Sequence, residues 1–426
     1  MKIFCSGIGG IGLSAYAAHM HERGHDVSGT DASKSAITDA LENMGVHVSF
    51  LQDGSAVPKE FDLLVYSEAI PTSSPERVRA RERGVTECSY FKALGDLTRG
   101  TNLLCVSGTH GKSSTTAMLA GVLIDANKDP SVVLGTKSAN LDGKNWRKGN
   151  TDLWLVEACE YRRSFHFLSP KVILLTNADG DHFDAFKDKA EYESAFVEFV
   201  KSLPKDGVIV YHKSDKDSAA IVAKSGKKGI DADDMPLVTM GVPGLHMRQN
   251  AQLVLKACEA LGIPLELSKK SLEKFSGTWR RMEKKGLTSA GVTVIDDYAH
   301  HPKEIAATLS AMKEAYPKQK IVCVFQPHTH HRTLALWDDF SRAFKDAHTV
   351  LLTDVYDARP DKDAEKVEVL RLAEDIKANS KVDVLTAMKF DEAKIILETE
   401  VLSPGDILIT MGAGDITKLS DSMFTK

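Results

Sequence analysis

The stretch Ser107-Gly108-Thr109-His110-Gly111-Lys112-Ser113 follows the strand-like run 102–106 and precedes an amphipathic, helix-like segment. A glycine turn between a strand and a helix that ends in Gly-Lys-Ser predicts a phosphate-binding loop. In such a loop backbone amides wrap the phosphate, the lysine offsets its charge and the hydroxyl can ligate Mg²⁺. Val106 stands where the standard spacing has another glycine, so the loop is a shortened GxxGK[ST]. We predict ATP binding by Gly108, Thr109, His110, Gly111, Lys112, Ser113 and Ser114.

Polar side chains lie at the carboxyl ends of two further candidate strands. The run 152–158 reads as a strand with Glu157 near its end, and the run 172–176 leads into the polar segment 177–182. The carboxyl ends of strands in an open α/β sheet form the ligand-binding edge. Carboxylates and phosphate oxygens are the usual Mg²⁺ ligands. We therefore expect Glu157 to bind magnesium and the segment that ends at His182 to be functional.

The N-terminal run Lys2–Ser6 leads into GIGGIG, in which Gly7, Gly9 and Gly12 form GxGxxG before a helix-like segment. Absent side chains and helix N-terminal amides let a diphosphate approach closely. Asp31 follows the second strand, where a carboxylate can accept hydrogen bonds from sugar hydroxyls. The motif indicates a dinucleotide or another diphosphate; a tight strand–helix turn without a ligand is the alternative.

Length and composition predict a multidomain α/β protein. The chain has 426 residues, a net charge of −5, 42% hydrophobic and 27% charged residues. Strand-like runs alternate with helical patterns, as in parallel sheets. We place boundaries in two polar stretches with few apolar residues, 95–101 and roughly 277–286, which gives domains 1–98, 99–280 and 281–426. Mild acidity argues against nucleic acid as a partner, no apolar run is long enough for membrane insertion, and six cysteines without a CxxC pair favour free thiols and a cytoplasmic location.

Five later motifs, together with the two glycine loops, carry a resemblance over essentially the whole chain. They are GLHMRQNA (244–251), FSGTWRRME (275–283), DDYAHHPKE (296–304), QPHTHHRT (326–333) and GAGDI (412–416). In this order they resemble the Mur ligases, the ATP-dependent amino-acid-adding enzymes of peptidoglycan synthesis. DDYAHHP is the most specific of the five.

The resemblance implies a three-domain architecture and a reaction. A Rossmann-like N-terminal domain would bind a UDP-sugar, a central P-loop domain with a mostly parallel sheet would bind ATP, and a Rossmann-like C-terminal domain would close over them. The implied partners are UDP-N-acetylmuramate and an amino acid, L-alanine in the nearest member of the family. The carboxylate would be activated as an acyl phosphate, with ATP and Mg²⁺ as cofactors. This reading replaces the dinucleotide with the diphosphate of the UDP-sugar.

The resemblance also implies roles for single residues. Those expected at the UDP-sugar are Gly9, Gly10, Ile11, Gly12, Asp31 and Ser67. The magnesium ligands would be Ser113, Glu157 and His182, and the nucleotide would also contact Asn250, Arg280 and Asp297. The incoming amino acid and the transferred phosphoryl group would meet Tyr298, His300 and Arg332. We expect Lys112, His182, His300 and Arg332 to be catalytic, with His300 as the candidate proton acceptor.

Four residues depart from the family pattern. Met247 stands where an asparagine is usual, Thr329 replaces an arginine, and Arg162 and Arg163 bring positive charge to a segment that is commonly acidic. These arginines predict either a solvated loop or an anion site. A sister ligase that uses another amino acid or a peptide, an oxidoreductase, and a non-catalytic nucleotide-binding relative remain as alternative functions.

Overall fold

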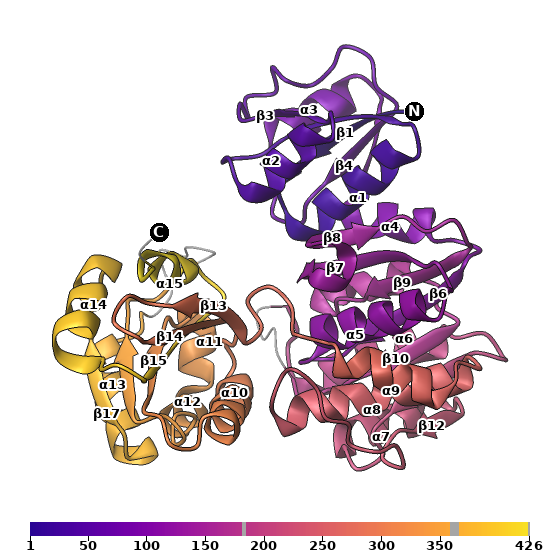
Figure 1. The fold of residues 1–426 in the computed structure, drawn as a ribbon. Helices are drawn as coiled ribbons and strands as arrows, with labels where there is room; N and C mark the ends of the chain where they lie inside the picture. Colours follow the sequence, from indigo (N-terminus) through magenta and orange to yellow (C-terminus); the bar gives the residue numbers. More distant parts are fainter. Residues whose placement is uncertain (181–184, 358–365, 425–426) are drawn as a thin grey trace. The chain divides into compact units, whose positions relative to one another are not determined.

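The computed structural model describes residues 1–180, 185–357 and 366–424. The described residues form three β-sheets, each with helices packed on it (Figure 1). This arrangement confirms the predicted α/β fold class. The described chain forms two compact units. The first holds residues 1–180, 185–236 and 251–272, with two of the sheets, and the second holds 237–250 and 273–424. The three domain ranges from the sequence stay a prediction.

The first sheet is parallel throughout, with the strand order β3-β2-β1-β4-β5. Its strands are β1 (Lys2–Ser6), β2 (Asp26–Thr30), β3 (His47–Ser49), β4 (Leu63–Tyr66) and β5 (Thr86–Ser89). The helices are α1 (Ile11–Glu22), α2 (Ala36–Asn43), α3 (Pro75–Glu82) and α4 (Tyr90–Leu97). The buried apolar pattern of β1 and of α1 places the GIGGIG turn at the carboxyl edge of this sheet.

The second sheet has the order β12-β11-β10-β6-β9-β7-β8 and is parallel except for the antiparallel β7–β8 hairpin. Its strands are β6 (Asn102–Ser107), β7 (Ser131–Ser138), β8 (Lys144–Arg147), β9 (Leu153–Glu157), β10 (Val172–Leu175), β11 (Val208–Tyr211) and β12 (Gly229–Asp231). The helical elements are α5 (Lys112–Asp125), η1 (Ala139–Leu141), η2 (Tyr161–Phe167), α6 (Lys189–Lys201), α7 (Lys216–Ser225), α8 (Leu245–Ala260) and α9 (Leu265–Glu273). β6 is central and almost wholly buried, so the loop that follows it has a rigid base.

The third sheet, in the second unit, has the order β13-β14-β18-β15-β16-β17 with β13 antiparallel at the edge. Its strands are β13 (Glu283–Leu287), β14 (Thr293–Asp297), β15 (Ile321–Phe325), β16 (Thr349–Leu352), β17 (Asp383–Thr386) and β18 (Ile407–Met411). The helical elements are α10 (Pro302–Ala315), α11 (His330–Ala335), α12 (Trp337–Arg342), α13 (Val369–Ser380), α14 (Phe390–Ile396), η3 (Leu397–Val401) and α15 (Thr417–Ser422). The motif DDYAHHP begins in the last two residues of β14, and QPH and GAGDI follow β15 and β18; the three strands are neighbours.

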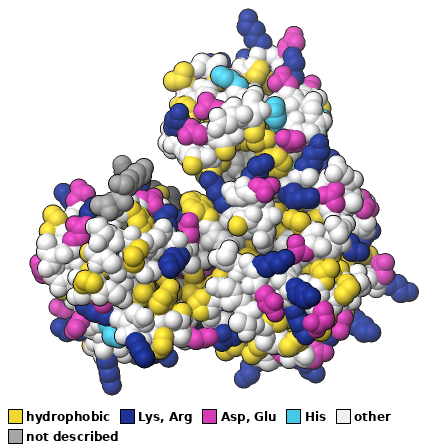
Figure 2. Space-filling view, viewed as in Figure 1, with side chains coloured by type: hydrophobic (Ala, Val, Ile, Leu, Met, Phe, Trp, Pro, Cys, Tyr) yellow, Lys and Arg dark blue, Asp and Glu magenta, His cyan; other side chains and the backbone are white. Residues whose placement is uncertain are grey.

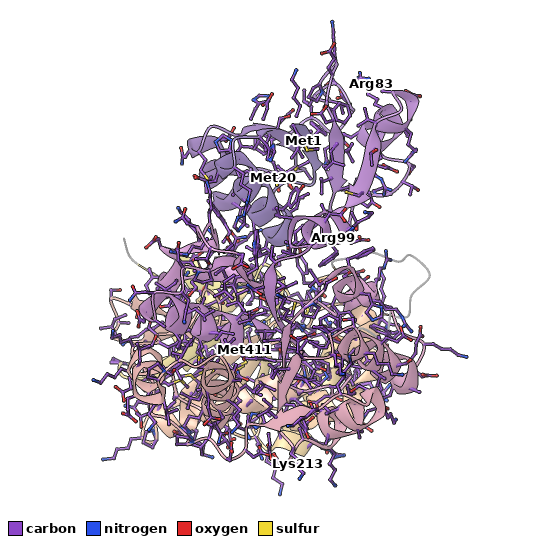
Figure 3. The ribbon with its side chains drawn as sticks, turned by 90° about the vertical axis from the view of Figure 1, so that its right-hand side faces the viewer. Met1, Met20, Arg83, Arg99, Lys213 and Met411 are labelled. Carbon is purple, nitrogen blue, oxygen red and sulfur yellow. The ribbon has the colours of Figure 1, made fainter. Side chains whose placement is uncertain are left out.

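The surface and the cysteines carry ordinary features. Acidic and basic side chains are interspersed over the visible face in Figure 2. No helix among the described residues is long and apolar enough to cross a membrane. All six cysteines are free thiols, and five of them are buried. Figure 3 labels Met20, near the end of α1, and Arg99, which lies between α4 and β6 where the chain leaves the first sheet.

Candidate active site

Two glycines shape the loop between β6 and α5. Gly111 has a φ of +80° and caps the N-terminus of α5. Gly108 has a φ of +142°, and a Cβ there would lie 2.1 Å from Thr176 Oγ1 and 2.7 Å from the carbonyl oxygen of Asn177. Both positions therefore require glycine, the first for its backbone conformation and the second also for space. The loop leaves the N-terminal amides of α5 unbonded to helix carbonyls, as an anion site requires.

Asn177 braces this loop from the next strand. Its amide oxygen accepts from the His110 backbone N–H at 2.8 Å, and its amide nitrogen donates to the His110 carbonyl at 3.1 Å. The Thr109 N–H donates to the Asn177 carbonyl at 3.1 Å, and Thr109 Oγ1 lies 2.8 Å from the Tyr192 hydroxyl. The polar segment predicted after β10 thus supports the loop. His182, the far end of that segment, lies outside the described residues.

Lys112 is held inside the loop by a buried acid. Its ammonium lies 3.0 Å from a carboxylate oxygen of Glu160, which is fully buried, and donates to the carbonyls of Gly108 and Thr109 at 2.5 and 3.0 Å. Burial lowers the pKa of Lys112, but the negative charge of Glu160, with a contribution from Glu157, outweighs that effect, so the pKa is raised and the amine stays charged. Glu160 was not among the predicted site residues.

Ser113 and Glu157 come together as predicted. The Ser113 hydroxyl donates to Glu157 Oε1 at 2.8 Å, and the Gly135 backbone N–H donates to Glu157 Oε2 at 2.7 Å. Ser114, in the same helical turn, is buried. A hydroxyl and a carboxylate this close at a phosphate loop form a hard-oxygen pair of the kind that suits Mg²⁺.

The two arginines after Glu160 adopt left-handed backbone conformations, with φ of 50° at Arg162 and 57° at Arg163. The Arg163 guanidinium donates to Glu198 at 2.8 Å and to Glu191 at 3.5 Å, both on α6. Arg162 lies over the Tyr161 ring, 5.5 Å from its centroid. Arg163 is thus already paired with carboxylates, which favours the structural interpretation of this residue.

In the N-terminal loop, glycines are required by close neighbours. A Cβ on Gly9 would lie 2.8 Å from Asp31 Oδ2, which accepts from the Gly9 N–H at 2.8 Å. A Cβ on Gly12 would lie 2.6 Å from Tyr90 Cε1. Ser67, which follows β4, donates from its backbone N–H to the Ser6 carbonyl at 3.0 Å. The predicted group Gly9, Gly10, Ile11, Gly12, Asp31 and Ser67 therefore gathers at one sheet edge, with the Asp31 carboxylate at the loop backbone.

In the second unit, Arg280 is anchored in the third sheet. Its guanidinium donates to Asp296 at 2.9 Å and to the carbonyls of Gly414 and Gly412 at 3.0 and 2.6 Å. The residue is 5% exposed and has a φ of 55°. The polar stretch 277–286 is therefore more than the connector that its composition suggested, because it includes a buried cation and the start of an edge strand.

Asp297 is a buried carboxylate at the end of β14. It accepts from the backbone N–H groups of Met282 and Ala299, both at 2.7 Å. Burial raises its pKa to about 6, while the nearby charge of Arg281 and the two hydrogen bonds act in the opposite direction. The carboxylate fixes the turn that carries the next predicted residues.

The residues after Asp297 form an aromatic and basic cluster. The ring nitrogen Nδ1 of His300 lies 3.0 Å from the Tyr298 carbonyl oxygen. The backbone N–H of His300 donates to the Glu304 carboxylate at 3.1 Å. The rings of His300 and His328 are 5.7 Å apart. Arg332 donates to His328 Nδ1 at 2.9 Å. The structure thus brings Tyr298, His300 and Arg332 together within the second unit. It adds His328 of the motif QPHTHHRT, which was not among the predicted site residues.

Thr329 and Met247, the two departures within the family motifs, have different surroundings. Thr329 has φ 63° and ψ 139°, a conformation costly for a β-branched residue, and it caps α11. Met247 is 4% exposed and therefore packs as a core residue. Asn250 lies one turn further along α8 and is 8% exposed. It belongs to the second unit with Arg280 and Asp297, whereas the phosphate loop and Glu157 belong to the first.

Family models match three consecutive parts of the chain. The Mur ligase family catalytic domain matches residues 2–101, the Mur ligase middle domain 106–252, and the Mur ligase glutamate ligase domain 280–414. The chain belongs to the Mur ligase family. The predicted resemblance is thereby confirmed, and each family segment corresponds to one of the three sheets.

Individual relatives cover the chain from end to end. A UDP-N-acetylmuramate–L-alanine ligase of Clostridium acetobutylicum is 36% identical, with 100% of this chain and 98% of the relative covered. One from Clostridium novyi is 35% identical, with coverage of 99% and 96%. The crystal structure of the UDP-N-acetylmuramate–alanine ligase of Thermotoga maritima has a TM-score of 0.84 and 28% identity, covering 99% of this chain and 98% of that one. A murein peptide ligase from Psychrobacter arcticus, 21% identical with a TM-score of 0.74 and the same coverage, shares the fold.

Proposed function

We propose that this Mur ligase joins L-alanine to the carboxylate of UDP-N-acetylmuramate, with ATP as the energy source, in peptidoglycan precursor synthesis. The observation that carries the proposal is the assembled phosphate site, Lys112 with Ser113 and Glu157, in a chain similar over its whole length to alanine ligases. A cytoplasmic location is part of this proposal. The peptide-adding sister activity has only a likeness of fold in its favour.

The residues of the site suit a carboxylate-activating reaction. Phosphoryl transfer to a carboxylate brings two anions together, so catalysis depends on fixed positive charge and positioning. Lys112 supplies one charge next to the α5 N-terminal amides. Ser113 and Glu157 would hold Mg²⁺, which when bound offsets negative charge on the phosphates. His182 and the amino-acid roles of Tyr298, His300 and Arg332 stay predictions.

The test is product formation with defined acceptors. We expect purified protein with ATP, Mg²⁺ and UDP-N-acetylmuramate to release phosphate and form the alanyl product with L-alanine, followed by mass spectrometry. Glycine, L-serine and the tripeptide L-alanyl-γ-D-glutamyl-diaminopimelate are the competing arms. Preferred use of the tripeptide would replace the proposal with the sister activity, and no product in any arm would leave a non-catalytic relative.

The variant Lys112→Ala tests whether the phosphate loop takes part in catalysis. Loss of one preorganised charge at the developing transition state lowers turnover on the order of 10²–10³-fold. UDP-N-acetylmuramate affinity, measured by calorimetry, should stay within about twofold, because the N-terminal loop is a separate site. A variant that keeps more than half of wild-type turnover would contradict the role of this loop in catalysis.

A further inference from the structure

Asn145, on β8 of the second sheet, contacts the N-terminal glycine loop of the first sheet. Its side-chain nitrogen donates to the Ile11 carbonyl at 2.5 Å and to Ser14 Oγ at 3.3 Å. Ser14 Oγ also donates to the Ile11 carbonyl, at 2.9 Å. Asn145 is 7% exposed, so these bonds are shielded from water. The first turn of α1, directly after the glycines, is thus fixed by a side chain of the other sheet.

The same hairpin contacts α1 along its length. His19 Nε2 donates to the Val132 carbonyl on β7 at 3.1 Å, and its ring packs 5.2 Å from Trp146 and 5.0 Å from Trp154. At the end of the helix, Lys148 Nζ donates to the Glu22 carbonyl at 2.6 Å. Figure 1 shows α1 beside β7 and β8, within the first compact unit. Helix α1 is therefore held at its start, middle and end.

The hairpin also reaches the phosphate loop of the second sheet. The Gly135 N–H on β7 donates to Glu157 Oε2, and Glu157 Oε1 accepts from Ser113 at the start of α5. A chain of hydrogen bonds and paired strands thus connects the first turn of α1 with the first turn of α5. Both turns follow a glycine loop at the carboxyl edge of a sheet.

We propose that Asn145 is a positioning residue for the UDP-sugar loop, and that the β7–β8 hairpin sets the spacing between this loop and the ATP loop. The proposal rests on the proposed function. Transfer from ATP to the sugar carboxylate requires the reacting atoms to come within about 3–3.5 Å, and a misplacement of about 1 Å can cost 10²-fold in rate. A buried amide bonded to the loop's first helical turn limits such misplacement.

Kinetics of Asn145→Ala and Asn145→Asp test this role. We expect Asn145→Ala to raise the KM for UDP-N-acetylmuramate about tenfold and to lower kcat by up to about 10²-fold, because the first loop is misplaced. The KM for ATP should stay within about twofold, because only the first loop loses its anchor. Asn145→Asp should be at least as severe, since a carboxylate cannot donate to the Ile11 carbonyl. The control is Asn102→Ala, which removes two exposed side-chain bonds, to Asp152 and Lys171, at the start of the central strand β6; both KM values should stay unchanged.

Hydrogen exchange of the free protein tests the anchor independently of the reaction. In Asn145→Ala, peptides within residues 7–16 should exchange at least tenfold faster, while those of α5 stay as in wild type. This result decides the anchor even if the wild type makes no alanyl product, which would count only against the proposed function. An unchanged KM for UDP-N-acetylmuramate in an active enzyme, or equal rises in both KM values with faster exchange throughout the second sheet, would overturn the proposal.

Discussion

The two glycine loops of the first unit have the same location in their sheets but differ in charge. Residues 7–12 contain no ionisable side chain and meet the acid Asp31, whereas residues 108–113 contain Lys112, paired with the buried Glu160. Recognition of a diphosphate that does not react can depend on backbone amides and a helix N-terminus. A loop at which phosphate is transferred needs a full, preorganised positive charge as well. The difference thus separates a binding loop from a reacting loop.

The substitution Glu160→Gln tests the charge difference between the two loops, and we expect it to have the largest effect. Removing one partner of a buried ion pair costs on the order of 3–5 kcal/mol, because the other charge stays buried. The side chains of Lys112 and Glu160 are 14% and 0% exposed, so solvent screens them little. We expect a fall of the melting temperature by roughly 10 °C and a larger stabilisation by ADP than in wild type, since phosphate then replaces the lost carboxylate.

Glu198→Gln is the control for that measurement. Glu198 pairs with Arg163 at 2.8 Å, but its side chain is 51% exposed, and such surface pairs contribute about 1 kcal/mol or less. Scanning calorimetry of both variants, with and without ADP, gives the comparison. Equal melting temperatures for the two variants would show that Lys112 does not depend on Glu160.

Gly12→Ala tests the first loop, with a smaller expected effect. The new Cβ would lie 2.6 Å from Tyr90 Cε1, and overpacking of this kind costs typically 1–3 kcal/mol. Because Gly12 lies in the first turn of α1, we expect the loop to shift and the KM for UDP-N-acetylmuramate to rise about tenfold, with the KM for ATP unchanged. In the double variant Gly12→Ala/Tyr90→Ala, the KM for UDP-N-acetylmuramate should return part of the way to the wild-type value. An unchanged KM in Gly12→Ala would contradict the idea that close packing against Tyr90 requires glycine at this position.

What the sequence predicts depends on the distance between partners along the chain. The phosphate loop, its flanking elements and the strand-end Glu157 follow local spacing rules, and they form as expected. The Asn145–Ile11 bond joins residues 134 positions apart, and no local pattern indicates it. Glu160 lies in irregular chain three residues after Glu157, and its contact with Lys112, 48 positions away, is likewise set by the tertiary fold. Strands β8 and β13 show only weak apolar alternation, so no local pattern predicts them.

The smallest expected effect concerns the pH dependence of the helix that carries the first loop. Burial lowers the pKa of His19 from 6.5 to about 4, although its bond to the Val132 carbonyl acts in the opposite direction. The unfolded chain therefore binds this proton more readily, and His19 makes the fold less stable as the pH falls from 6.5 towards 4. At pH 5.5, one pH unit below the ordinary pKa, the loss of unfolding free energy relative to pH 7.5 is about 1 kcal/mol.

The variant His19→Gln tests this effect. The glutamine keeps a donor for the Val132 carbonyl and does not titrate, so the stability of the variant should fall less over the same interval. Urea unfolding followed by tryptophan fluorescence, which includes the signals of Trp146 and Trp154 beside His19, measures the difference. His246, whose pKa burial also lowers to about 4, is common to both proteins and cancels. Parallel pH profiles for wild type and His19→Gln would show that His19 does not contribute to the pH dependence of stability. The two loops would then differ only in the Lys112–Glu160 ion pair, and not in the titration of a residue that holds α1.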